Sequence, residues 1–136
     1  MRQQPTLRDR IAARIAESGD DVFLPREFRD LGGEDQVLRA LRTLVRDGKL
    51  IRLGYGVYGR AVISSLTGRP MLTGDGFQAV ARHALDKLGV AWDLTEFQRA
   101  YNEGRSTQVP VNPAVRVKSR FSRNLRYWDR DLLVER

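Results

Sequence analysis

Long polar side chains recur on one side of the segment from Glu34 to Arg46. They are Gln36, Arg39, Thr43 and Arg46, with Arg42 at the flank. Guanidinium and carboxamide groups form paired hydrogen bonds with base edges and phosphates, and a hydroxyl adds a single one. The spacing of three or four residues puts these groups on one face only if the segment is helical. Such a face either contacts nucleic acid or is an ordinary solvated helix surface.

The other side of the same segment is apolar. Val37, Leu38, Leu41, Leu44 and Val45 recur at helical spacing, so they share one face. Glu34 and Asp35 suit the positive end of a helix, and Gly48 suits its termination. The pattern predicts an amphipathic helix that packs on a core and exposes its arginines.

Two helices and a short strand are expected before it. Thr6 can cap a helix that carries Leu7, Ile11 and Ile15 four residues apart. The stretch Val22–Pro25 is too short for a helix and rich in strand-forming residues. Residues 25–31 form a second, short helix that ends at a pair of glycines, and this is typical of a helix-turn-helix connection.

A small hairpin follows in the stretch GKLIRLGYGVYGR, residues 48–60. Its arms, Leu50–Leu53 and Val57–Tyr58, are joined by Gly-Tyr-Gly. The order of elements is that of a winged helix-turn-helix with the hairpin as its wing. Arg52, Tyr55 and Arg60 would then contact the DNA backbone and not the bases. The alternative for Tyr55 is that it packs back onto the hairpin.

Residues 61–72 are expected to be a connecting segment, and two amphipathic helices follow within residues 74–89 and 93–104. In the second helix Leu94, Phe97 and Tyr101 are in register and form the predicted apolar face. In Val115–Phe121 apolar residues alternate with Arg116, Lys118 and Arg120, which predicts a strand with one basic face. A hairpin turning at Asp129–Arg130 ends the chain. This basic face would contact DNA or an acidic partner, or it is a solvated edge strand whose charges protect it against aggregation.

The expected fold is α+β: a winged helix-turn-helix in residues 1–62, then a small domain of two helices and antiparallel strands in residues 63–136.

Composition limits the function classes. The 136 residues carry a net charge of +7, and the last 32 residues hold eight basic and three acidic side chains. Such a surplus favours a polyanionic partner such as nucleic acid. The chain has no cysteine and a single histidine, so we expect no metal centre and no cofactor. No apolar run is long enough to span a bilayer, so we expect a cytoplasmic protein and no membrane contact.

Two parts of the sequence resemble AbiEi-type antitoxins of bacterial type IV toxin–antitoxin loci. LVRDGKLIRLGYGVYGR (Leu44–Arg60) is similar to the end of their winged helix, and LTGRP (Leu66–Pro70) followed by STQVPV (Ser106–Val111) is similar to their spacer and downstream domain. The resemblance implies a DNA-binding protein that represses its own operon and counteracts a nucleotidyltransferase-like toxin. The approach to Ser-Thr-Gln, YNEGR (Tyr101–Arg105), departs from the leucine-containing pattern of the family.

These observations favour a sequence-specific transcription regulator that binds double-stranded DNA at its own operator. They leave a winged-helix module for RNA or protein contact as an alternative. A metal-dependent nuclease would need clustered carboxylates, for which Asp129, Asp131 and Glu135 are the candidates. No general base and no nucleophile motif accompanies them, so we do not expect an enzyme.

Overall fold

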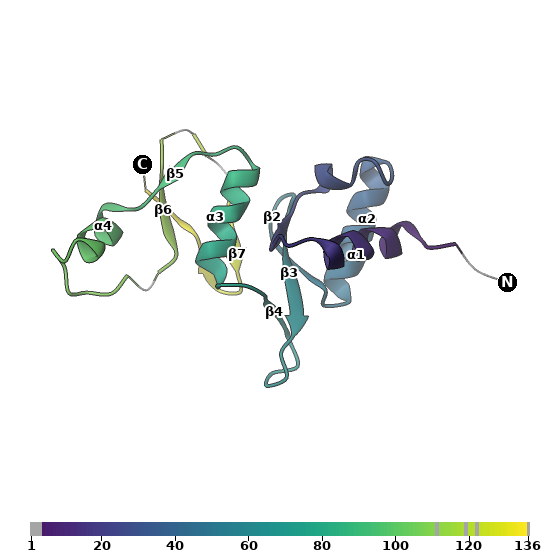
Figure 1. Cartoon of the computed structure of the whole chain (residues 1–136), viewed down its shortest axis with the longest axis horizontal. Helices are drawn as coiled ribbons and strands as arrows, with labels where there is room; N and C mark the ends of the chain where they lie inside the picture. The colour runs from purple at the N-terminus through teal and green to yellow at the C-terminus, as the bar shows by residue number, and fades with distance from the viewer. Residues whose placement is uncertain (1–3, 111, 119, 122, 136) are drawn as a thin grey trace. The chain divides into compact units, whose positions relative to one another are not determined.

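The computed structural model describes residues 4–110, 112–118, 120–121 and 123–135 (Figure 1). Val111, in the Ser-Thr-Gln-Val-Pro-Val segment, and Ser119, in the expected basic strand, lie outside the described residues. The fold is α+β, and the chain forms two compact units, Met1–Gly74 and Asp75–Arg136. The sequence had suggested a boundary after residue 62. Among the described residues no helix is long and apolar enough to cross a membrane.

The described residues of the first unit form seven elements. In chain order they are α1 (Leu7–Glu17), β1 (Val22–Phe23), a 3₁₀ helix η1 (Pro25–Phe28), α2 (Glu34–Arg46), β2 (Leu50–Gly54), β3 (Val57–Ile63) and β4 (Pro70–Leu72). At the start of α1, Thr6 Oγ1 accepts a hydrogen bond from Asp9 N at 3.1 Å, and Asp9 Oδ2 accepts one from Thr6 N at 3.2 Å. This reciprocal cap satisfies two amides that the first turn leaves without helical partners.

The core of this unit lies between the two helices and the sheet. Ile11 of α1, Leu41 and Leu44 of α2, and Phe28 of η1 are fully buried together with Leu50 of β2. α1 packs against α2, and Figure 1 shows both helices on the same side of β2 and β3. The periodicity of the sequence therefore identified the buried faces of both helices correctly.

The sheet is larger than the sequence suggested. β3 lies between β1 and β2 and pairs antiparallel with both, and its last residues pair with β4. The expected connecting segment of residues 61–72 is thus mostly a second hairpin, which extends from the sheet in Figure 1. Ala61 and Leu72 face each other and are buried, so the hairpin adds to the core. The second predicted helix is shorter than expected: it is a single 3₁₀ turn that ends at Phe28 and does not reach residue 31.

In the second unit the described residues also form seven elements. They are α3 (Phe77–Lys87), β5 (Trp92–Asp93), α4 (Glu96–Asn102), β6 (Ala114–Val117), β7 (Arg126–Tyr127), β8 (Arg130–Asp131) and β9 (Leu133–Glu135). β6 pairs antiparallel with β5 but parallel with β9, which the expectation of antiparallel strands throughout did not include. β7 and β8 form a separate hairpin that turns at Trp128–Asp129, one residue earlier than predicted.

α4 buries a different face from the predicted one. Phe97 and Tyr101, expected in the core, are 44% and 40% exposed, whereas Thr95 and Gln98 are 6% exposed. Gln98 Oε1 accepts from Thr95 N at 2.9 Å, and Gln98 Nε2 donates to Ala114 O at 3.0 Å. Because these bonds satisfy the buried polar groups, the amide can replace an apolar side chain between α4 and β6.

Candidate nucleic-acid interface

The exposed side of α2 carries most of the polar residues that the sequence selected. Gln36, Arg39, Arg42 and Arg46 are exposed, while Val37 and Leu41 on the opposite side are buried. Thr43 differs, because it is half-buried and its Oγ1 donates to Arg39 O at 3.1 Å. That bond back to the helix occupies the only proton of the hydroxyl, so Thr43 is a weaker candidate for base contact than predicted.

The arginines of the first unit fall into two groups. On α1, Arg8 pairs with Asp47, and Arg14 pairs with Asp30 through two hydrogen bonds of 2.6 and 2.7 Å. The hydrogen bond from Arg14 holds the pKa of Asp30 below its usual value, and the same bond raises the pKa of Arg14. These carboxylates therefore neutralise Arg8 and Arg14, two of the three arginines of α1.

The arginines of α2 are not neutralised in this way. Within the part of the chain that the structure describes, Arg39, Arg42 and Arg46 form no ion pair and no side-chain hydrogen bond. Asp35 lies one helical turn before Arg39, yet it makes no ion pair with it. The guanidinium groups on this face therefore keep their donors for an external acceptor.

The β2–β3 hairpin adds two more groups beside α2. Its turn consists of Tyr55 and Gly56, and Gly56 has the left-handed φ of 66° that glycine adopts without strain. Tyr55 is 75% exposed, so its phenol does not pack into the core. Arg52 is exposed as well, and its Nε lies 3.4 Å from the oxygen of Gly54.

A groove of about 210 Å³ lies between α2 and the hairpin. It is lined by Arg42 of α2, Arg52 and Tyr55 of the hairpin, and by Glu34, Leu38, Pro25, Gly56 and Tyr58. Two guanidinium groups and a phenol on one groove can hold a phosphate, whereas the carboxylate of Glu34 can accept from a base amino group. Glu34 and Leu38 were not among the residues predicted for this site. Leu38 lies four residues before Arg42, and Glu34 lies four residues before Leu38, so helical spacing on a helix next to a hairpin was the available signal.

Arg60 does not belong to this surface. Its Nε donates to Asp20 O at 3.1 Å, and its Nη2 donates to Asp20 O at 2.9 Å and to Ser18 O at 2.6 Å. The guanidinium carbon lies 5.4 Å from the centre of the Phe23 ring. The residue is half-buried and joins β3 to the loop after α1, so we withdraw it from the candidate DNA contacts.

The basic residues of the second unit do not share a strand face. β6 ends at Val117, so Arg116 is on the strand whereas Lys118 and Arg120 follow it. All three are exposed, but Arg116 has Asp93 of β5 and Glu135 of β9 as its partners across the sheet, with Glu135 Oε1 3.9 Å from its Nε. The predicted uniformly basic face is therefore interrupted by acids.

Two of the three carboxylates considered for a nuclease lie beside cations. Asp131 is 3.6 Å from Arg126 and Glu135 is 3.9 Å from Arg116, while Asp129 is exposed in the turn after β7. Among the described residues no group of three or more histidine, cysteine, aspartate or glutamate side chains could hold a metal ion.

Comparison with protein-family models found no match, and comparison with curated proteins and with solved structures found none either. The functional assignment therefore depends on the geometry of the first unit and on the sequence motifs.

Proposed function

We propose that the protein is a DNA-binding transcription regulator in which the first unit acts as a winged helix-turn-helix. In this proposal α2 enters the major groove and the β2–β3 hairpin contacts the flanking backbone. The observation that carries the proposal is a difference between the arginines: Arg8 and Arg14 of α1 are paired with acids, whereas Arg39, Arg42 and Arg46 of α2 form no ion pair within the described residues. They lie beside a groove that also holds Arg52 and Tyr55. Unpaired guanidinium groups on one exposed helix are the donors that base edges and phosphates require.

We further propose that the target is the protein's own operator, and that the protein acts in the cytoplasm as the antitoxin of a type IV toxin–antitoxin system. This part follows from the resemblance of Leu44–Arg60 and Ser106–Val111 to AbiEi-type antitoxins. The partner would be a nucleotidyltransferase-like toxin encoded next to it. Co-expression tests this directly: the protein should restore growth of cells that express the neighbouring reading frame, and failure to do so would leave a regulator without antitoxin activity.

The DNA part is tested by fluorescence anisotropy with the DNA upstream of the gene, with random DNA of equal length and with an RNA of equal length. Arg39→Ala should weaken operator binding by about 1–3 kcal/mol and random binding much less, because Arg39 is at the centre of the exposed face. Arg52→Ala should weaken binding to both DNAs equally and reduce the slope of log K against log salt by about 1.

Arg10→Ala is the matched control, because Arg10 is exposed on α1 and its loss changes the net charge equally. We expect it to leave the preference for the operator unchanged. If Arg10→Ala weakens operator binding as strongly as Arg39→Ala does, nonspecific electrostatic attraction explains the affinity and α2 is not the recognition helix. Equal affinity for the RNA would favour the alternative of an RNA-binding module.

A further inference from the structure

Arg82 of α3 is a half-buried cation with no acidic partner among the residues that the structure describes. Its guanidinium carbon lies 4.8 Å from the centre of the Trp92 ring, and Trp92 Nε1 in turn donates to Asp86 Oδ1 at 2.8 Å. The Nε of Arg82 is buried and has no hydrogen-bond partner in the described part of the chain. Within the described residues Arg82 forms no ion pair, and burial lowers its pKa. A cation held in this way costs folding free energy, and a bound anion would offset that cost.

The surroundings of Arg82 form a pocket of about 380 Å³. Neutral polar side chains line much of it: Gln78, Gln98, Asn102 and Tyr101, together with the apolar Ala79, Leu94, Val109 and Pro110 and one carboxylate, Asp75. A single guanidinium, neutral amides and one acid fit a singly charged anion better than a phosphate dianion. The planar guanidinium matches the two oxygens of a carboxylate.

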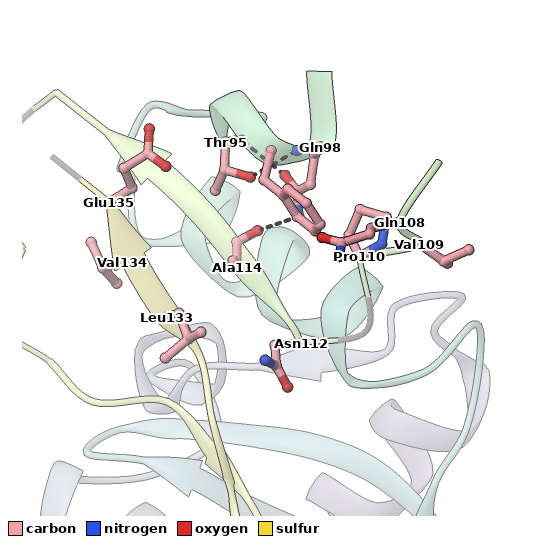
Figure 2. A pocket seen from close by; sticks show the side chains of 11 residues that line it. Thr95, Gln98, Gln108, Val109, Pro110, Asn112, Ala114, Leu133, Val134 and Glu135 are labelled. Atoms are coloured by element: carbon pink, nitrogen blue, oxygen red, sulfur yellow. Dashed lines mark hydrogen bonds between the residues drawn. The ribbon is translucent and has the colours of Figure 1, made fainter. Parts of the chain in front are cut away.

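An apolar groove adjoins this pocket. Its volume is about 660 Å³, and it shares Gln98, Val109 and Pro110 with the pocket. Figure 2 shows it between α4, the segment with Gln108 to Pro110, and strands β6 and β9. Val109 and Leu133 line it and are 59% and 51% exposed, and the exposed ring of Phe97 lines it as well. A ligand whose charged end lies at Arg82 can therefore extend an apolar body along this groove.

We propose that the second unit binds a small organic monocarboxylate, with its carboxylate on Arg82 and its hydrocarbon part over Val109 and Pro110 in the apolar groove. The stack on Trp92 fixes the guanidinium plane, so that the terminal nitrogens meet both carboxylate oxygens. This site is separate from the candidate DNA interface and does not depend on DNA binding.

The test is a titration of the ¹⁵N-labelled full chain with hexanoate, observed by NMR. The indole N–H of Trp92 reports on the site, and the indole N–H of Trp128, in the turn after β7, is the internal reference. We expect a saturable shift of the Trp92 signal with a dissociation constant on the order of 1 mM. Octanoate should bind about four- to fifteenfold more tightly, because each buried methylene adds apolar contact. Hexanol, with the same chain and no charge, and inorganic phosphate, with charge and no chain, should give no saturable shift.

Arg82→Gln should abolish the shift, while Arg130→Gln, which removes an exposed arginine of the same unit, should leave the affinity within twofold. Should Arg82→Gln fail to fold, Arg82→Lys replaces it: we expect at least fivefold weaker binding, and an unchanged affinity would overturn the proposal. Saturation with hexanol or phosphate in place of hexanoate, an unchanged affinity in Arg82→Gln, or no shift with either carboxylate would each overturn it as well.

Discussion

Replacement of Arg60 separates a structural role from a DNA-contacting one. In the folded unit its guanidinium donates to the backbone oxygens of Ser18 and Asp20 and lies over the Phe23 ring. Arg60→Met keeps the aliphatic stem, which packs like that of arginine, but removes every donor. The substitution therefore isolates the hydrogen bonds and the ring contact.

The expected loss of stability can be worked from these contacts. Two carbonyl groups lose their donor, at about 1 kcal/mol each, and a partly buried cation–ring contact adds about 0.5–2 kcal/mol. Methionine recovers part of this through its own contact with the ring. We expect a net loss of about 2–3 kcal/mol, which lowers the midpoint of thermal unfolding of a unit of roughly 70 residues by about 10–20 °C.

The assay is thermal and urea unfolding of the full chain followed by circular dichroism, with Arg52→Met as the control. Arg52 is an exposed residue of the neighbouring strand, so its replacement should change stability by less than about 0.5 kcal/mol. The salt slope of DNA binding should be unchanged in folded Arg60→Met. An Arg60→Met protein that is as stable as the wild type but has lost a phosphate contact would refute the structural role.

Three further predictions concern stability and are measured by the same unfolding assays. Gly48→Ala should cost about 1–2 kcal/mol, since Gly48 has a φ of 78° and the new Cβ would lie 2.5 Å from Ile63 Cδ1, whereas Gly19→Ala, with open space around it, should be near neutral. Asp9→Asn should be less stable than the wild type at neutral pH, and the stabilities of the two proteins should converge in acid. The cap hydrogen bonds lower the folded-state pKa of Asp9 below 3.8, so the stabilisation by the Asp9 carboxylate is present above pH 3.8 and is lost as the pH falls through the folded-state pKa. Gln98→Met should cost about 1–2 kcal/mol because it leaves the buried amide of residue 95 without an acceptor, and an unchanged stability would show that this amide finds another partner.

The parts of the fold that sequence periodicity determines were predicted well. The buried faces of α1 and α2 follow from apolar residues repeated every three or four positions, because a helix brings those positions onto one side. The β2–β3 hairpin follows from Gly-Tyr-Gly between two apolar arms. Such signals are local, so a single stretch of chain contains all the information that they need.

The parts that were missed depend on distant partners. Arg60 was assigned to the wing because its neighbours in sequence are wing residues, but its acceptors lie about 40 residues earlier. The β3–β4 hairpin was overlooked because Ser64 to Arg69 has the composition of a loop, and only pairing shows that both flanks are strands. In α4 the apolar residues have helical spacing, yet Phe97 is exposed and Gln98 is buried. Gln98 is buried because its side chain finds a polar partner, the backbone oxygen of Ala114 on β6.

The position of Glu34 bears on how selective the proposed interface is. Its carboxylate lines the same groove as Arg42 and Arg52, in the first turn of α2, where the helix dipole favours a negative charge. In the proposed DNA complex this carboxylate repels phosphates that approach the groove in the wrong register. It can also accept a hydrogen bond from the amino group of a cytosine. In that complex Glu34 would therefore lower the affinity for random DNA more than the affinity for a site that places a cytosine beside it. A surface with arginines alone would bind more tightly and discriminate less, so in this proposal the acid adds specificity at the expense of affinity.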